Sequence, residues 1–289
     1  MRIGVNLMVW TGPFTEDDLP LLERCRDMGV GAVEIPILAL DRFRPETVHE
    51  HLTVLGLECS TSAGVPAGCS LLIEDERSRG IDWIRRVIEI SAGLGSRMVS
   101  GPFYSPVGQL TGRGPTRREW DSALVGLSEV ASIASDYGLT INLEPLNRFE
   151  THFLNTAADA VRLVEEVGKR ALGVQLDTFH MNIEEKSLTS AIRSTGVLLK
   201  HFHCSENDRG IVGTGHIDWH GVISALRETG YPGWLTIESF GQPMPELAAA
   251  ASVWRALAPS ADELARQSLR FLEGILSQDR TGNDGEGFS

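Results

Sequence analysis

The sequence predicts an α/β fold: a single (β/α)8 barrel of the TIM type with an extended C-terminal helix. Apolar, strand-like runs alternate with amphipathic helical stretches along the 289 residues, which implies a parallel sheet. Counting gives about eight strand–helix units, the number that closes such a barrel. A doubly wound open sheet is the rival fold, but the first strand-like run leads into Trp10-Thr11-Gly12-Pro13-Phe14, which lacks the GxGxxG turn typical of that fold.

The first half of the chain supplies four of the expected units. Its strands are apolar runs bounded by glycine, proline or polar residues, and its helices show apolar stripes of period 3.6. The expected strands cover Ile3–Trp10, Ala32–Ile35, Leu57–Ser62 and Arg97–Phe103. The expected helices cover Glu16–Met28, Pro45–Leu55, Asp75–Leu94 and Thr116–Tyr137.

The second half repeats this rhythm, and glycine follows three of the expected helices, at Gly138, Gly168 and Gly230. No low-complexity linker divides the chain, so we expect one catalytic barrel domain over residues 1–278 and a disordered, polar tail over 279–289. The expected strands cover Thr140–Glu144, Gly173–Asp177, Leu198–Cys204 and Trp234–Glu238. The expected helices cover Ala157–Val167, Thr189–Thr195, Asp218–Thr229 and Glu246–Leu276.

Charge and composition narrow the classes of partner. The formal net charge of −13 disfavours nucleic acids and anionic membranes, whereas a neutral sugar or polyol fits. No apolar run approaches the ~20 residues that cross a bilayer, and the start of the chain lacks the apolar region of a signal peptide. The four cysteines form no CxxC pair, which favours free thiols in a reducing compartment. We therefore expect a soluble, cytoplasmic protein.

Four polar side chains stand at the ends of the last four expected strands: Glu144, Asp177, His203 and Glu238. In a (β/α)8 barrel these strand ends surround one pocket. Taken singly, each residue has an ordinary structural explanation, as a helix cap or a hydrogen-bonded buried group. Together, three carboxylates and one imidazole favour a divalent cation, with Mn²⁺ or Co²⁺ preferred and Mg²⁺ as a further option. Zn²⁺ fits less well because no thiolate takes part.

Several segments of the second half resemble the ketose 3-epimerases, the D-tagatose, D-allulose and L-ribulose 3-epimerase group of the xylose isomerase-like barrels. The most specific segment is Asp-Thr-Phe-His-Met-Asn-Ile-Glu-Glu, residues 177–185. Shorter matches are residues 143–150, 201–209, 213–215, 218–219 and 237–240. The resemblance spans most of the chain and is strongest from Glu144 onward. It implies an isomerase that acts on a small ketose, assembled as a homodimer or homotetramer.

The resemblance also implies roles for individual residues. The metal ligands carry over onto the four strand-end residues, and two of these, Glu144 and Glu238, are implied as the acid/base pair. Contacts with the substrate carry over onto Glu150, His180 and Arg209. Epimerisation at C3 removes a proton beside the C2 carbonyl and returns one to the opposite face, so it needs a base on each side. The resulting enediolate would be stabilised by the cation.

Three alternatives stay open at this point. An aldose–ketose isomerase or an inosose-type dehydratase would use the same barrel and cation with another proton route. A non-catalytic sugar-binding barrel would not need two opposed bases.

Arg209 lies in a glycine-containing loop and could be an ordinary surface charge. Trp10, Phe14 and Phe240 could wall the sugar or pack in the core. The loops after strands one, three and four do not identify the preferred sugar.

Overall fold

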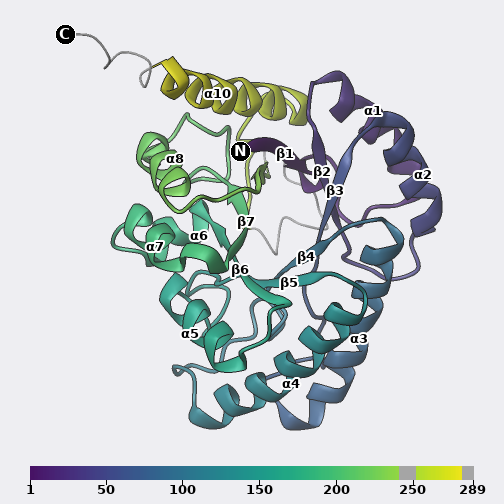
Figure 1. The fold of residues 1–289 in the computed structure, drawn as a ribbon, viewed down its shortest axis with the longest axis vertical. Helices are drawn as coiled ribbons and strands as arrows, with labels where there is room; N and C mark the ends of the chain where they lie inside the picture. The colour runs from purple at the N-terminus through teal and green to yellow at the C-terminus, as the bar shows by residue number, and fades with distance from the viewer. Residues whose placement is uncertain (241–251, 282–289) are drawn as a thin grey trace.

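Eight parallel strands close into one barrel, which confirms the predicted fold class. The computed structural model describes residues 1–240 and 252–281. Each strand pairs with its neighbours in sequence, and β1 pairs with β8 to complete the ring. The described helices surround this ring. The last of them, α10, lies beside α8 and β1 at the top of Figure 1. The strands are β1 Arg2–Asn6, β2 Ala32–Pro36, β3 Glu58–Ser62, β4 Met98–Gly101, β5 Thr140–Leu143, β6 Leu172–Asp177, β7 Leu199–Cys204 and β8 Trp234–Ile237.

The helices on the outside of the barrel follow the expected pattern closely. Their ends carry capping signals: the side chain of Asp218 caps α8, and Gly168, which the sequence places just after a helix, ends α5 with a φ of 66°. The α-helices are α1 Leu19–Asp27, α2 Pro45–Leu55, α3 Glu74–Gly93, α4 Arg117–Asp136, α5 Ala157–Val167, α6 Thr178–Glu184, α7 Leu188–Thr195, α8 Trp219–Glu228 and α10 Ala261–Thr281. Three short 3₁₀ segments are η1 Leu7–Val9, η2 Glu16–Asp18 and η3 Gly196–Leu198.

Several elements differ from the prediction. The first strand ends at Asn6, because the Asn6 side chain accepts a hydrogen bond from the Met8 amide and starts η1. The short helix α6 was not expected; Asp177 caps it with its side chain. The expected C-terminal helix Glu246–Leu276 starts in residues that lie outside the described part; within 252–281, α10 begins at Ala261, since Pro259 precedes it and the Ser260 hydroxyl accepts from the Glu263 amide.

Helix α10 continues to Thr281, three residues past the expected end of the barrel domain at 278, and residues 282–289 lie outside the described part. The four cysteines are free thiols. Within residues 1–240 and 252–281, none of the helices has the length and apolarity that a membrane span requires.

The interior of the barrel is polar, while the outer faces of its strands are apolar. Side chains alternate along a strand, so apolar residues such as Val33 and Phe202 pack under the helices. The polar residues between them point inward and pair across the ring: Asn6 is in register with Glu34, and Gln175 with His201. Most barrels fill this space with branched apolar side chains. In this protein the inward-facing side chains are polar instead, and they lie directly beneath the site at the carboxyl ends of the strands.

Candidate active site

The four predicted ligand residues come together at the carboxyl ends of β5 to β8. Glu144 and Glu238 directly follow β5 and β8, Asp177 ends β6, and His203 lies near the end of β7. All four side chains are buried. The Nδ1 atom of His203 lies 3.3 Å from Glu238 Oε1 and 4.0 Å from Asp177 Oδ2. Ligand atoms of Glu144, Asp177 and His203 lie within 4.8 Å of one another.

Local backbone structure aims these side chains. Asp177 Oδ1 accepts a hydrogen bond of 2.7 Å from the Phe179 amide, so its other oxygen, Oδ2, is left to face the site. Glu144 is held by its amide, which donates to the carbonyl of Gly101 on β4. Gly101 has a φ of 141°, and a Cβ there would lie 2.1 Å from the carbonyl oxygen of Ala63. Only glycine, which has no Cβ, lets the backbone at position 101 approach Ala63 so closely beside the site.

Arg209 lies inside the site and is not a surface charge. Its side chain is 7% exposed, and its Nη1 atom donates to Asp177 Oδ2 at 2.8 Å and to Glu238 Oε2 at 2.6 Å. The guanidinium also packs over the rings of Phe179 and Phe240, at 4.1 and 5.1 Å from the ring centroids. Its backbone has a φ of 65°, an uncommon conformation for a residue with a side chain. The bulky planar cation is therefore held between two carboxylates and two aromatic rings.

His180 and Glu150, the other predicted contacts, border the same space. His180 Nδ1 accepts from the backbone amide of Asn147 at 3.1 Å, and its Nε2 lies 3.2 Å from Arg209 Nη2, which can only donate. Burial, with the nearby Arg209 charge, holds the pKa of His180 well below its ordinary value, so the ring is neutral. Asn147 Nδ2 also donates to Glu150 Oε1 at 2.7 Å. Asn147 thus braces both residues, while Arg148 pairs with Glu184 outside the site.

The site holds more negative charge than its cations balance. Burial, together with Glu238 and Asp177, raises the pKa of Glu144 well above its ordinary value. Burial also raises the pKa of Asp177 to about 7, although Arg209 opposes this shift. For Glu238, burial acts to raise the pKa, but His203 and Arg209 outweigh it and hold it well below the ordinary value. Positive charge nearby therefore compensates the carboxylate of Glu238 well, but not those of Glu144 and Asp177.

These residues fit a divalent cation. Glu144 Oε1 is buried and has no hydrogen-bond partner, although a buried carboxylate oxygen normally has one. A cation beside Glu144, Asp177, His203 and Glu238 would supply that partner and the missing positive charge. The set of three oxygen ligands and one imidazole nitrogen suits Mn²⁺, Co²⁺ or Mg²⁺.

A cavity of about 200 Å³ opens onto this site. One side is formed by the polar residues that follow β5 to β8, which include Glu144, His180 and Glu238. The other side comes from small or apolar residues of the first half of the chain and from Phe240. Trp10 and Phe14 do not line the cavity: Trp10 Nε1 donates to Asp262, and Phe14 packs edge-on against Phe43. The remaining small or apolar lining residues are Met8, Leu38, Ser62, Ala63, Gly64, Ser100, Gly101, Pro102, Val107 and Leu146.

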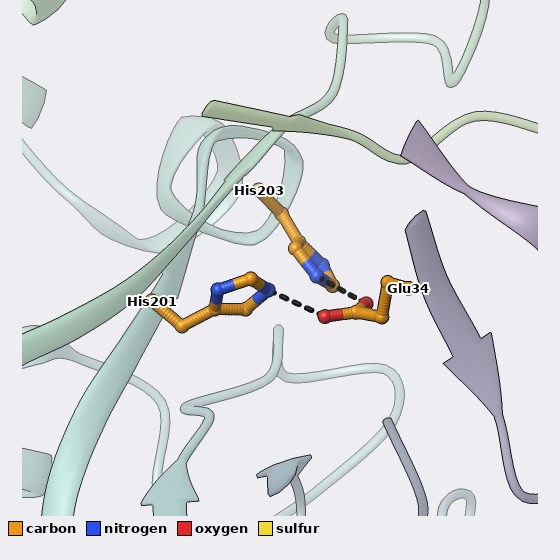
Figure 2. A group of neighbouring side chains, drawn as sticks. All are labelled: Glu34, His201 and His203. Atoms are coloured by element: carbon orange, nitrogen blue, oxygen red, sulfur yellow. Dashed lines mark hydrogen bonds and ion pairs between the residues drawn. The ribbon is translucent and has the colours of Figure 1, made fainter. Parts of the chain in front are cut away.

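A second cluster lies on the far side of His203 and was not anticipated from the sequence. Glu34 on β2 reaches across the barrel to His201 and His203 on β7, and all three side chains are fully buried (Figure 2). The separations are 2.5 Å from His201 Nε2 and 2.8 Å from His203 Nε2 to the two carboxylate oxygens. Two signals were available: a glutamate within the apolar run Ala32–Ile35, and two histidines spaced to share one face of a strand.

A closed (β/α)8 barrel with a buried, cation-type site at the carboxyl ends of its strands defines a class of barrel enzymes. The chain belongs to one family of that class, the Xylose isomerase-like TIM barrel family, which matches residues 22–275. It is 33% identical over 274 residues to a probable ketose 3-epimerase from Synechocystis sp., with 94% of this chain and 96% of the relative covered.

Solved structures agree with this assignment. An L-ribulose 3-epimerase structure superposes with a TM-score of 0.92 at 31% identity, covering 98% of this chain and 97% of the other. A D-allulose 3-epimerase from Methylomonas sp., solved in complex with D-allulose, gives a TM-score of 0.90 at 26% identity, covering 95% and 97%. These likenesses confirm the resemblance to the ketose 3-epimerases, and the chain is an enzyme of the isomerase class.

Proposed function

We propose that this enzyme epimerises free ketoses at C3, with D-fructose/D-allulose, D-tagatose and L-ribulose as candidate substrates. The observation that carries the proposal is the pair of buried glutamates, Glu144 and Glu238, at one cavity with an unbalanced negative charge. Relatives that act on such sugars support the choice of substrate class. Among the described residues that line the cavity, the basic ones are Arg209 and the histidines, and Arg209 already pairs with two carboxylates, which favours a sugar without a phosphate.

In this proposal Glu144 and Glu238 are the two acid/base groups. They follow β5 and β8, so they approach the cavity from different sides. One carboxylate takes the C3 proton, and the other returns a proton to the opposite face of the same carbon. Glu144, Asp177, His203 and Glu238 would hold the cation, which would be Mn²⁺ or Co²⁺. When bound, the cation would supply positive charge that stabilises the enediolate formed by proton removal.

The remaining polar residues would hold the reacting end of the sugar. Because Nδ1 of His180 already accepts from the Asn147 amide, the proposal places the ring proton on Nε2, which requires Arg209 Nη2, 3.2 Å from that atom, to turn away when a sugar binds. His180 can therefore donate to a carbonyl or hydroxyl oxygen without changing its own charge. Arg209 is a permanent donor, since it stays protonated at all working pH values. Glu150, held by Asn147, would accept from a hydroxyl group.

The proposal is tested by incubating the purified enzyme and Mn²⁺ with a panel of ketopentoses and ketohexoses in deuterated water. We expect the C3 epimer to form, with deuterium at C3 and none at C1. An aldose product with deuterium at C1 would favour the aldose–ketose isomerase, and loss of water from an inosose, incubated in parallel, would favour the dehydratase. Failure of every sugar to react, in an enzyme that still binds them, would favour a non-catalytic sugar-binding barrel.

Four further properties stay predictions from the sequence. The relative kcat/KM across the sugar panel would identify the preferred ketose. Metal analysis of the purified enzyme would identify the native cation. A homodimer or homotetramer is expected from the resemblance, and sedimentation would test it. A cytoplasmic location is expected from composition, and fractionation of cells would test it.

A further inference from the structure

The two ring nitrogens of His203 face different groups. Nδ1 faces the carboxylates of the proposed cation site, with Glu238 Oε1 at 3.3 Å, and it also lies 3.1 Å from the side-chain amide nitrogen of Gln175. Nε2 faces away from that site and lies 2.8 Å from Glu34 Oε1 (Figure 2). The histidine ring therefore stands between the cation site and a buried carboxylate that comes from the opposite wall of the barrel.

The carboxylate of Glu34 is surrounded by hydrogen-bond donors. Its Oε1 atom accepts from Asn6 Nδ2 at 2.6 Å as well as from His203, and its Oε2 atom accepts from Ser60 Oγ at 3.2 Å. His201 Nε2 lies 2.5 Å from Oε2. Glu34 Oε1 already accepts from Asn6 Nδ2, an amide nitrogen that can only donate, so this oxygen is an acceptor and the Nε2 atom of His203 must be the donor to it.

We propose that Glu34 is a positioning residue for the cation site: by accepting the Nε2 proton of His203, it fixes the ring and reserves the Nδ1 lone pair for the cation. This inference rests on the proposed metal site. A histidine ligand has its tautomer and orientation set by the hydrogen bond at its other nitrogen, and loss of such a partner typically weakens metal binding about 10- to 100-fold. The close contacts of Asn6 with Oε1 and of His201 with Oε2 hold the carboxylate in place.

A second cation bound by Glu34, His201 and His203 is the alternative for this cluster. Two ligands of one tetrahedral cation, each ~2.1 Å from it, lie ~3.4 Å apart. Glu34 Oε1 and His203 Nε2 form a hydrogen bond of 2.8 Å, and His201 Nε2 contacts Oε2 at 2.5 Å; both separations are shorter than the spacing of two ligands around one cation. Among the described residues, Glu34 and His201 are fully buried and do not line the cavity. The cluster therefore supports one cation instead of binding another.

Three variants of the full-length enzyme separate hydrogen bonding at Glu34 from its charge. Glu34→Leu removes every acceptor, so we expect the Kd for Mn²⁺, measured by calorimetry, to rise about 10- to 100-fold. Glu34→Gln keeps an acceptor: Asn6 can only donate to Oε1, so the amide oxygen takes that position and continues to accept from His203. We expect a smaller rise, less than ~10-fold. Ser60→Ala, the matched control, touches Glu34 but not His203, and should bind Mn²⁺ like the parent.

The tautomer itself is read by nuclear magnetic resonance on the Zn²⁺-loaded parent, with His203→Gln used to assign the signals. We expect a single, slowly exchanging ring proton of His203 on Nε2, and this measurement does not depend on whether Glu34→Leu folds. A proton on Nδ1 would overturn the proposal. Equal losses of Mn²⁺ affinity in Glu34→Leu and Glu34→Gln would also overturn it. So would Mn²⁺ binding by Glu34→Leu that equals the parent's, or the release of two ions per chain instead of one.

These results are distinguishable from a failure of the proposed function. Cation affinity and the His203 signal are measured without any sugar. An enzyme that binds Mn²⁺ as expected, and loses it as expected in Glu34→Leu, would support the positioning role even if no ketose reacts. A parent enzyme that binds no divalent cation would instead remove the metal site, and with it both proposals.

Discussion

Replacement of Arg209 by glutamine should destabilise the metal-free enzyme far more than the Mn²⁺-loaded enzyme. Arg209 bridges Asp177 and Glu238 in a buried position, so its removal leaves two carboxylates without their cation. Breaking a buried ion pair in this way costs about 3–5 kcal/mol. A chain of this length has an unfolding entropy of about 0.6 kcal/mol/K, so the melting temperature should fall by about 5–8 °C. Bound Mn²⁺ would compensate the same carboxylates, and the loss should then shrink to less than half.

The assay is thermal unfolding of the parent and Arg209→Gln, with EDTA and with excess Mn²⁺. Arg86→Gln is the matched control, because Arg86 pairs with Asp41 where both side chains are exposed, and such surface pairs contribute about 1 kcal/mol or less. Its effect should be small and independent of Mn²⁺. An equal loss of melting temperature in Arg209→Gln with and without Mn²⁺ would refute the view that arginine and cation compensate the same carboxylates.

Three more expectations concern the same centre. Glu238→Gln should lower turnover by about 10²–10⁴-fold while sugar still binds, as measured by calorimetry with a ketose; turnover near the parent level would remove Glu238 from the acid/base role. EDTA should inactivate the enzyme, and Mn²⁺ or Co²⁺ should restore activity; indifference to prolonged chelation at raised temperature would contradict a metal requirement. Affinity for Mn²⁺ should fall as the pH drops through about 7, the raised pKa of Asp177, because the protonated carboxyl cannot bind the cation. Calorimetry in buffers of different ionisation enthalpy would detect the released protons, and an affinity that is constant from about pH 8 to 6 would count against this ligand.

The residues at the strand ends were predictable because two independent patterns coincide there. Strand-like runs locate the carboxyl end of each strand, and a parallel barrel gathers those ends at one pocket. Glu144, Asp177, His203 and Glu238 each stand at the end of such a run, so the fold alone brings them together. Arg209 was harder to place, since a loop gives no periodicity. Only the structure shows its burial between carboxylates.

Glu34 and His201 were missed for a physical reason. From sequence alone, a charged residue within an apolar run is expected at the edge of a strand, because an unpaired buried charge is costly. Whether a partner exists depends on contacts across the barrel, and β2 and β7 are not neighbours in the sheet. The start of α10 depended on Pro259 and Ser260, local signals that the apolar periodicity of the segment outweighed in the prediction.

The cavity wall is divided between the two halves of the chain, and this division has an evolutionary consequence. The groups proposed to move protons belong to β5–β8, whereas Met8, Leu38 and Val107 come from loops of β1, β2 and β4. Mutations in those loops can reshape the space for the distal carbons of a sugar without moving any proton-transfer group. One ancestral barrel could thus diversify across many monosaccharides by exchanging the residues of its first half while inheriting the second half intact.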